Sequence, residues 1–115
     1  MGGANLLPVT VGGGGVAFGG AEIKVDTAGA APGATATLCV RPHLVGLGDG
    51  PNRLTGTVEE IQWRGATHRL YVDVAGHRVM ADLRELKAPP GIGEPVSLHF
   101  SPDDAVLLPA GVNHG

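Results

Sequence analysis

Hydrophobic and polar residues alternate over several short stretches in the second half of the chain. The clearest is Leu70–Val74, in which three aliphatic residues alternate with an aromatic and an acidic one. Val79–Leu83 and Val96–Phe100 follow the same period of two, which places successive side chains on opposite faces of a strand. Ala105–Leu108 is a last short apolar run. These stretches predict β-strands, and no segment sustains the period of about 3.6 residues of an amphipathic helix.

The stretch Leu54–Trp63 predicts a longer strand with one irregularity. Its apolar residues Val58 and Ile61 are three positions apart, which breaks the period of two. A β-bulge at Glu59-Glu60 restores the alternation, because a bulge adds one residue to one strand of a pair. We expect this strand to curl strongly, as the strands of small closed barrels do.

The first forty residues predict further strands joined by glycine-rich turns. Leu6–Val11 is followed by a run of four glycines. Val16–Phe18 and Ala21–Val25 flank Gly19-Gly20, which suits a tight hairpin turn because glycine readily adopts positive φ. Thr37–Arg41 alternates again and ends at a proline, which has no N–H to give to a sheet.

Two stretches rich in glycine and proline connect the strands of the second half. Gly46–Asn52 is predicted to be a loop, and Glu85–Gly93 is predicted to be a crossover with a helical turn around Leu83–Lys87. Five strands with a crossover before the last pair are typical of an OB-like barrel.

Together these elements predict an all-β fold, an OB-like small barrel with additional N-terminal strands. Residues 1–40 supply the N-terminal strands, residues 41–110 form the barrel and residues 111–115 are a tail. The side chains expected in the core are Leu38, Val40, Val58, Leu70, Val72, Val74, Val79, Leu98 and Phe100.

The composition agrees with one β-domain. The chain has 115 residues, and 43% of them are hydrophobic, which is enough for a core. Its 20 glycines and 9 prolines follow no collagen-like period, so they indicate tight turns. No apolar run approaches the roughly 20 residues that span a bilayer. Met1-Gly2-Gly3 lacks the features of a secretion signal, and the single Cys39 cannot form an internal disulfide. We therefore expect a soluble, cytoplasmic protein.

The net charge of −3 argues against a nucleic-acid partner. Binding to phosphate groups needs a basic surface, and the Lys and Arg residues are scattered along this chain. Without such a surface, Trp63 and Tyr71 are a weak stacking platform for bases. We expect these two side chains to pack at a subunit interface or over the end of the barrel.

No catalytic motif accompanies the strands. Neither Gly12–Gly15 nor Gly46–Gly50 continues into the Lys-Ser/Thr pair and helix of a P-loop, so both are expected to be turns. Neighbouring carboxylates such as Glu59-Glu60 point to opposite faces of a strand unless a bulge turns them together, and Asp103-Asp104 follow Ser-Pro as turn residues, so a structural role is expected for both pairs. Cys39 has no nucleophile motif around it. We expect no enzymatic activity and no cofactor.

The histidines are expected to lie on the surface and to bind no metal. No pair is spaced i, i+4 on a predicted helix, and one cysteine is too few for a zinc quartet. On the strand pattern, His99 points away from Leu98 and Phe100 toward solvent. His68 and His77 flank one hairpin, where they are able to approach each other. The full set is His43, His68, His77, His99 and His114.

Several short motifs occur in a particular order along the chain. They are Asn5-Leu6-Leu7-Pro8, Val40-Arg41-Pro42, Gly56-Thr57-Val58, Gly65, Gly93–Phe100 and Ser101–Pro109. Their order and spacing resemble the transport-associated OB (TOBE) domain found at the C-terminus of ATP-binding subunits of bacterial ABC importers. The positions that carry this resemblance are Arg41, Pro42, Gly56, Val58, Gly65 and Pro109. His43 stands where that family usually has an acid.

The resemblance implies a non-catalytic regulatory and dimerisation domain of an ABC-importer ATPase subunit. The implied partners are a second copy of itself, the nucleotide-binding domain of the parent subunit, and a small-molecule or protein effector. The segment Asn5–Pro8 resembles iron, polyamine and phosphonate importers more than sugar importers. Such a subunit is cytoplasmic and peripheral to the inner membrane through the transporter complex, without inserting into the bilayer.

The alternative is a related molybdate-type OB module that holds oxyanions at subunit interfaces. Asn52–Val58 partly matches the signature of that module, but Asp49–Asn52 replaces its Ser-Ala-Arg-Asn stretch. Pro51 has no N–H to donate, and Asp49 places a negative charge where an anion would sit. We therefore expect no binding of molybdate, tungstate or sulfate.

Overall fold

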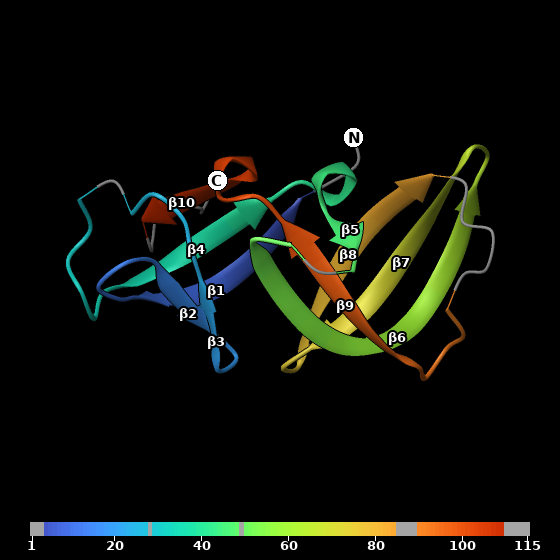
Figure 1. Ribbon diagram of the computed structural model, residues 1–115, viewed down its shortest axis with the longest axis horizontal. Helices are drawn as coiled ribbons and strands as arrows, with labels where there is room; N and C mark the ends of the chain where they lie inside the picture. Colours follow the sequence, from blue (N-terminus) through green and yellow to red (C-terminus); the bar gives the residue numbers. More distant parts are fainter. Residues whose placement is uncertain (1–3, 28, 49, 85–89, 110–115) are drawn as a thin grey trace.

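The computed structural model describes residues 4–27, 29–48, 50–84 and 90–109, and it consists of two five-stranded antiparallel sheets. The sheets lie side by side along the long axis of a molecule of 43 × 28 × 23 Å (Figure 1). The first sheet has the order β10-β4-β1-β2-β3 and the second the order β5-β9-β6-β7-β8. The strands are β1 (Asn5–Val11), β2 (Val16–Phe18), β3 (Ala21–Ile23), β4 (Thr35–Val40), β5 (Gly46–Leu47), β6 (Asn52–Arg64), β7 (Thr67–Val74), β8 (His77–Arg84), β9 (Pro95–Phe100) and β10 (Ala105–Pro109).

Two single-turn 3-10 helices, η1 (Pro42–Leu44) and η2 (Pro102–Asp104), follow β4 and β9. Each has proline at its first position, where the fixed φ of the ring suits a helical start and the missing N–H costs nothing. Within the described part of the chain, no helix has the length and apolar character that a membrane crossing requires.

The two halves of the chain are structural repeats that exchange their last strands. β1 to β4 with η1 correspond to β6 to β9 with η2, and the strands take equivalent places in the two sheets. β5 follows β4 in the chain but pairs with β9, whereas β10 follows β9 but pairs with β4. The registers match, because Leu47 lies opposite Leu98 and Leu107 lies opposite Leu38. Neither sheet is complete without a strand from the other half.

Two buried asparagines join the halves through equivalent pairs of hydrogen bonds. Asn5, the first residue of β1, donates its amide N–H to the carbonyl of Met80 (2.8 Å) and accepts from the Met80 N–H (2.7 Å). Asn52, the first residue of β6, donates to the carbonyl of Lys24 and accepts from its N–H, both at 2.8 Å. Both side chains are almost fully buried. Each asparagine therefore satisfies backbone groups of a segment from the other half.

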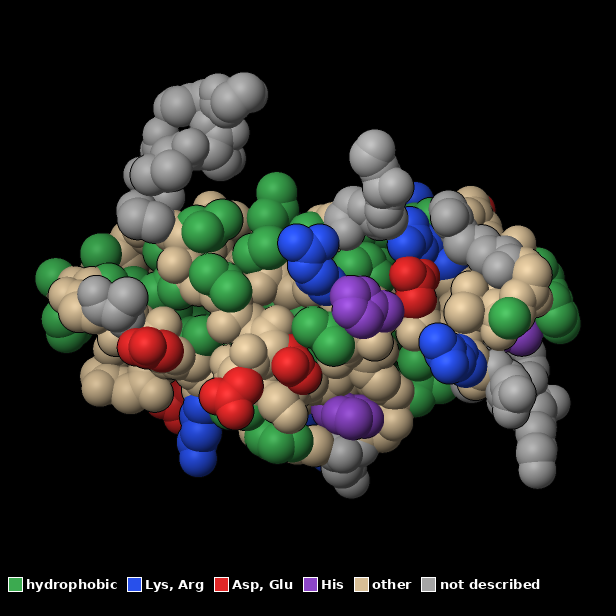
Figure 2. Space-filling model, turned by 90° about the horizontal axis from the view of Figure 1, so that it is seen from above, with side chains coloured by type: hydrophobic (Ala, Val, Ile, Leu, Met, Phe, Trp, Pro, Cys, Tyr) green, Lys and Arg blue, Asp and Glu red, His purple; other side chains and the backbone are tan. Residues whose placement is uncertain are grey.

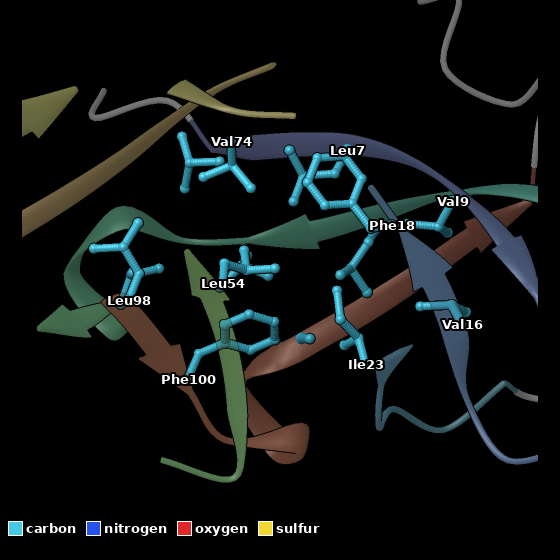
Figure 3. Packing of buried hydrophobic residues seen from close by; sticks show 14 of the residues in the cluster. Leu7, Val9, Val16, Phe18, Ile23, Leu54, Val74, Leu98 and Phe100 are labelled. Carbon is cyan, nitrogen blue, oxygen red and sulfur yellow. The ribbon is translucent and has the colours of Figure 1, made fainter. Parts of the chain in front are cut away.

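One hydrophobic core fills the space between the sheets. Figure 3 shows Leu7, Val9, Val16, Phe18 and Ile23 from the first sheet packed toward Leu54, Val74, Leu98 and Phe100 from the second. All nine residues that the sequence predicted for the core are buried, so the strand periodicity is confirmed. The all-β prediction is confirmed as well, in the form of two curled sheets of an OB-type fold.

The predicted bulge in the long strand is confirmed. The register between β6 and β7 shifts between Val58 and Glu60, which lets Val58 and Leu70 share the inner face. β6 pairs with β9 along its first half and with β7 along its second half. It is strongly bent between these two partners (Figure 1). Gly56 lies where a Cβ atom would come within 2.3 Å of the carbonyl oxygen of Asp73. The curl therefore requires glycine at this position.

The structure corrects the predicted place of the last strand. Residues 105–109 were expected in the barrel of residues 41–110, but β10 pairs with β4 in the first sheet. Local alternation does not specify which strand is the neighbour. Gly46–Asn52, predicted to be a loop, contains the short β5 and the start of β6. Of the helical turn expected around Leu83–Lys87, the first two residues are in β8 and the rest lie outside the described residues. The boundary at residue 40 and the tail stay predictions.

Candidate interaction surface

The outer face of the first sheet is unusually apolar. The inward residues of β1 are buried, and its outward residues include Leu6, which is 54% exposed, and Pro8. The register places Leu6 beside Cys39 of β4, and Cys39 beside Val106 of β10, which is 57% exposed. A sheet with one solvated face normally carries polar residues on that face. Here both faces carry apolar side chains, which is the pattern of a sheet covered on both sides.

A groove of about 330 Å³ runs over this outer face. Its floor consists of β4 and β10, and the charged residues at its edge are Arg41, directly before η1, and two aspartates of η2. Figure 2 looks onto the molecule from above and shows hydrophobic side chains exposed over the half that holds the first sheet. The residues that line the groove are Cys39, Arg41, Leu44, Asp103, Asp104, Val106 and Leu108.

The charged edge of the groove is built by the two proline-initiated turns. Arg41 lies between β4 and η1 in an extended conformation (φ −77°, ψ 140°), and its side chain is exposed. Asp103 and Asp104 form η2, where the Asp104 N–H donates to the carbonyl of Ser101. Because Val40 at the end of β4 lies opposite Ala105 at the start of β10, Arg41 and Asp104 flank the same end of this strand pair. The groove is thus lined by a basic residue from one turn and by acidic residues from the other.

A second exposed feature is Trp63, near the tip of the β6–β7 hairpin. Its side chain is 74% exposed, and its ring lies against that of His68 with the centroids 3.9 Å apart. His68 is only 5% exposed, and neither ring nitrogen has a hydrogen-bond partner among the described residues. The prediction of a surface histidine is therefore wrong for His68, which the indole ring covers.

His68 and His77 do not approach each other. They lie near opposite ends of the β7–β8 pair, since His68 is opposite Leu83 and His77 is opposite Val74. His77 contacts the ring of Phe18 instead, with the centroids 5.3 Å apart. Across the part of the chain that the structure describes, no three His, Cys, Asp or Glu side chains come together in a way that could hold a metal ion.

Trp63 and Tyr71 lie on opposite faces of the β6–β7 hairpin. Trp63 is opposite His68 and Tyr71 is opposite Glu60, and these pairs face different sides because Glu60 and Trp63 are three positions apart on a regular stretch of β6. The guanidinium carbon of Arg78 lies 5.0 Å from the centre of the Tyr71 ring. A joint stacking platform of the two aromatic rings is therefore not formed.

An ion pair ties β7 to β8 on the outer face of the second sheet. The guanidinium of Arg69 donates to both carboxylate oxygens of Asp82, at 2.6 and 2.8 Å, and Arg69 is nearly buried. Hydrogen bonding to Asp82 raises the pKa of Arg69 above its already high usual value, so the pair stays charged. Such bidentate geometry fixes the register of the two strands.

A second groove, of about 540 Å³, lies between η1, the end of β8 and β9. One wall is the half-buried ring of His99, which was expected to point to solvent. The ring lies over Gly46 and Gly50, where an added Cβ atom would be 2.7 Å from it. The residues lining this groove are His43, Leu44, Val45, Gly46, Thr67, Asp82, Leu83, Arg84 and His99.

The six positions that carry the family resemblance do not gather at one site. Pro42 is buried in η1, Val58 is buried at the bulge, and Gly65 occupies the β6–β7 turn with φ +69°. Arg41 lines the first groove, Gly56 permits the curl of β6, and Pro109 is the last residue of β10. Their role as functional residues stays a prediction.

Sequence reasoning missed the repeat and its two asparagines, although the sequence carries a signal for both. Leu38, Val40 and Pro42 recur as Leu98, Phe100 and Pro102 with the same spacing. Each repeat also begins its first long strand with asparagine, followed two residues later by leucine. A search for internal similarity would have found these positions.

Comparisons with known proteins give two overlapping family matches. A sequence model of the TOBE domain matches residues 38–108, and one of the CysA C-terminal regulatory domain matches residues 5–47. Relatives from Salmonella typhimurium, Salmonella choleraesuis and Salmonella typhi are each 35% identical over 96 residues, or 81% of this chain. Their names describe a 2-aminoethylphosphonate import ATP-binding protein, PhnT. The chain spans 26% of the length of these relatives.

A solved structure with the same fold is that of the cytoplasmic molybdate-binding protein ModG with molybdate bound. It matches with a TM-score of 0.73 over 91% of this chain and 95% of ModG. Because the sequences are 18% identical, this likeness concerns the fold alone.

Proposed function

The chain belongs to the family of TOBE domains, and from that premise we propose that it is the non-catalytic regulatory C-terminal domain of an ABC-importer ATP-binding subunit. The observation that carries the proposal is the combination of the two family matches, which together run from residue 5 to residue 108. The second match is to a C-terminal regulatory domain, and the relatives are named as ATP-binding proteins of an importer.

The substrate class of the importer is the finer part of the proposal. The segment Asn5–Pro8 resembles those of iron, polyamine and phosphonate importers, and the names of the Salmonella relatives favour the phosphonates among these. The proposed cargo of the whole transporter is therefore a small aminoalkyl phosphonate.

The proposed task of the domain is to pair two ATP-binding subunits and to receive regulation. Its partners would be a second copy of itself, the nucleotide-binding domain of the parent subunit, and a small-molecule or protein effector. In a subunit whose nucleotide-binding domains already meet, the second contact is effectively intramolecular, at an effective concentration in the millimolar range for short linkers. A weak contact between the two TOBE domains is then sufficient.

Three experiments test the proposal and its cargo. Purified chain mixed with Mg-ATP should show no turnover, and a nucleotide-dependent activity that survives repurification would contradict a non-catalytic domain. Reading the gene upstream of residue 1 should reveal an ATP-binding domain, in the same frame or as an adjacent gene.

For the cargo, the transporter should restore growth of an uptake-deficient strain on 2-aminoethylphosphonate as its phosphorus source, and growth on iron or polyamines instead would redirect the assignment.

A further inference from the structure

The outer face of the first sheet has the side chains of a covered surface. Two cross-strand rows lie on it: Leu6, Cys39 and Val106 form one, and in the other Thr37 lies between Pro8 and Leu108. Leu6 and Val106 are more than half exposed. Exposed apolar side chains that lie next to each other, rather than singly, mark an interaction surface.

The charges at the edge of the groove are self-complementary. Arg41 directly follows β4 and Asp104 directly precedes β10, next to the paired residues Val40 and Ala105, and both line the groove. Consider two copies packed face to face, with a two-fold axis parallel to the strands and midway between β4 and β10. The rotation places β4 of one copy over β10 of the second copy and leaves each residue at the same height along the axis. Arg41 of each copy therefore lies opposite Asp104 of the other copy. In the same way, Val106 of each copy lies opposite Cys39 of the other. One patch thus supplies both halves of an isologous contact.

We propose that this outer face, formed by β1, β4 and β10, is the surface through which two copies of the domain pair. The inference rests on the proposed function, in which two subunits come together, and it adds the contact surface and its symmetry. The apolar rows provide the buried centre, and the Arg41–Asp104 pairs set the orientation at the rim. The Trp63 hairpin lies in the other sheet and takes no part in this contact.

The first test measures association of the purified chain by sedimentation equilibrium, up to about 1 mM, which is the effective concentration expected for two domains held together in the paired parent subunits. Val106→Glu should weaken association about a hundredfold or more, because each copy would bury an unpaired charge. Its melting temperature should match that of the parent, since Val106 is more than half exposed. The matched control Trp63→Ala should leave the Kd unchanged.

The second test uses the charges and the single cysteine. Arg41→Asp alone and Asp104→Arg alone should each weaken the pair, and the two together should restore the parental Kd, because the contacts are then reversed in both copies. Packed sheets lie about 10 Å apart. A thiol-reactive bis-maleimide of about that length should therefore link two Cys39 side chains in the parent and fail to do so in Val106→Glu.

Each outcome decides the inference. A chain that stays monomeric, or one that dimerises equally well with Val106→Glu, shows that this face is not the self-contact. Loss of association in Trp63→Ala instead would assign the contact to the hairpin. Neither result changes the outcome of the ATP-turnover and gene-context tests. An error in the assigned contact surface is therefore distinguishable from an error in the proposed function.

Discussion

The two buried asparagines give the sharpest test of how the halves of the domain are joined. Replacing Asn52 by alanine removes two hydrogen bonds of 2.8 Å and leaves the N–H and carbonyl of Lys24 without these partners. A net hydrogen bond contributes about 0.5–1.5 kcal/mol, and an unsatisfied buried group costs about 1–3 kcal/mol. Because Lys24 is exposed, water is able to replace part of the lost hydrogen bonding. We therefore expect a loss of about 2–4 kcal/mol in the free energy of unfolding.

Asn5→Ala removes the equivalent pair to Met80 and should cost the same within about 1 kcal/mol. Since domains of this kind have a total stability of about 5–15 kcal/mol, the double variant should be close to unfolded at room temperature. Equal costs of the two single variants are the signature of the structural repeat. A scaffold without this symmetry would give two unrelated values.

The assay is urea unfolding followed by far-UV circular dichroism, with the slope m compared between variants to exclude a change in the denatured state. Thermal melts should fall by about 10–20 °C in each single variant. Glu22→Ala, on an outward position of β3, is the matched control and should stay within about 0.5 kcal/mol of the parent. A loss below about 0.5 kcal/mol for Asn52→Ala would refute the view that its side chain holds the two halves together.

Three further predictions concern the core, the curl of β6 and the binding of oxyanions. Val72→Asp should unfold the domain, because Val72 is fully buried, and a variant that melts like the parent would show that the core is misassigned. Gly56→Ala should cost about 1–3 kcal/mol, measured by urea unfolding, because its Cβ atom would meet the Asp73 carbonyl oxygen at 2.3 Å. Molybdate, tungstate and sulfate should leave the melting temperature unchanged, because Pro51 lacks an N–H and the Asn52 amide is engaged with Lys24. A saturable rise of several degrees, equivalent to about 2.7 kcal/mol at a hundred times Kd, would revive the oxyanion-binding alternative.

The sequence by itself determined which stretches are strands and which of their faces are buried. Successive side chains of a strand point to opposite faces, so the spacing of Leu70, Val72 and Val74 was sufficient to predict that all three are buried. The broken period at Val58 and Ile61 likewise reported a bulge, because a local insertion is the way to keep both residues on the inner face. The motifs from Val40-Arg41-Pro42 to Pro109 were sufficient to indicate the family.

The tertiary structure decided which strands are neighbours, and with them the surfaces. The pairing of β10 with β4 joins residues more than sixty positions apart, and strand alternation is the same whichever partner is chosen. The roles of Asn5 and Asn52 follow from that exchange, since each asparagine bonds a segment of the opposite half. The burial of His68 under Trp63 depends on cross-strand register in the same way. The apolar outer face exists because β10 sets Val106 beside Cys39 and Leu6, an adjacency that long-range pairing alone creates.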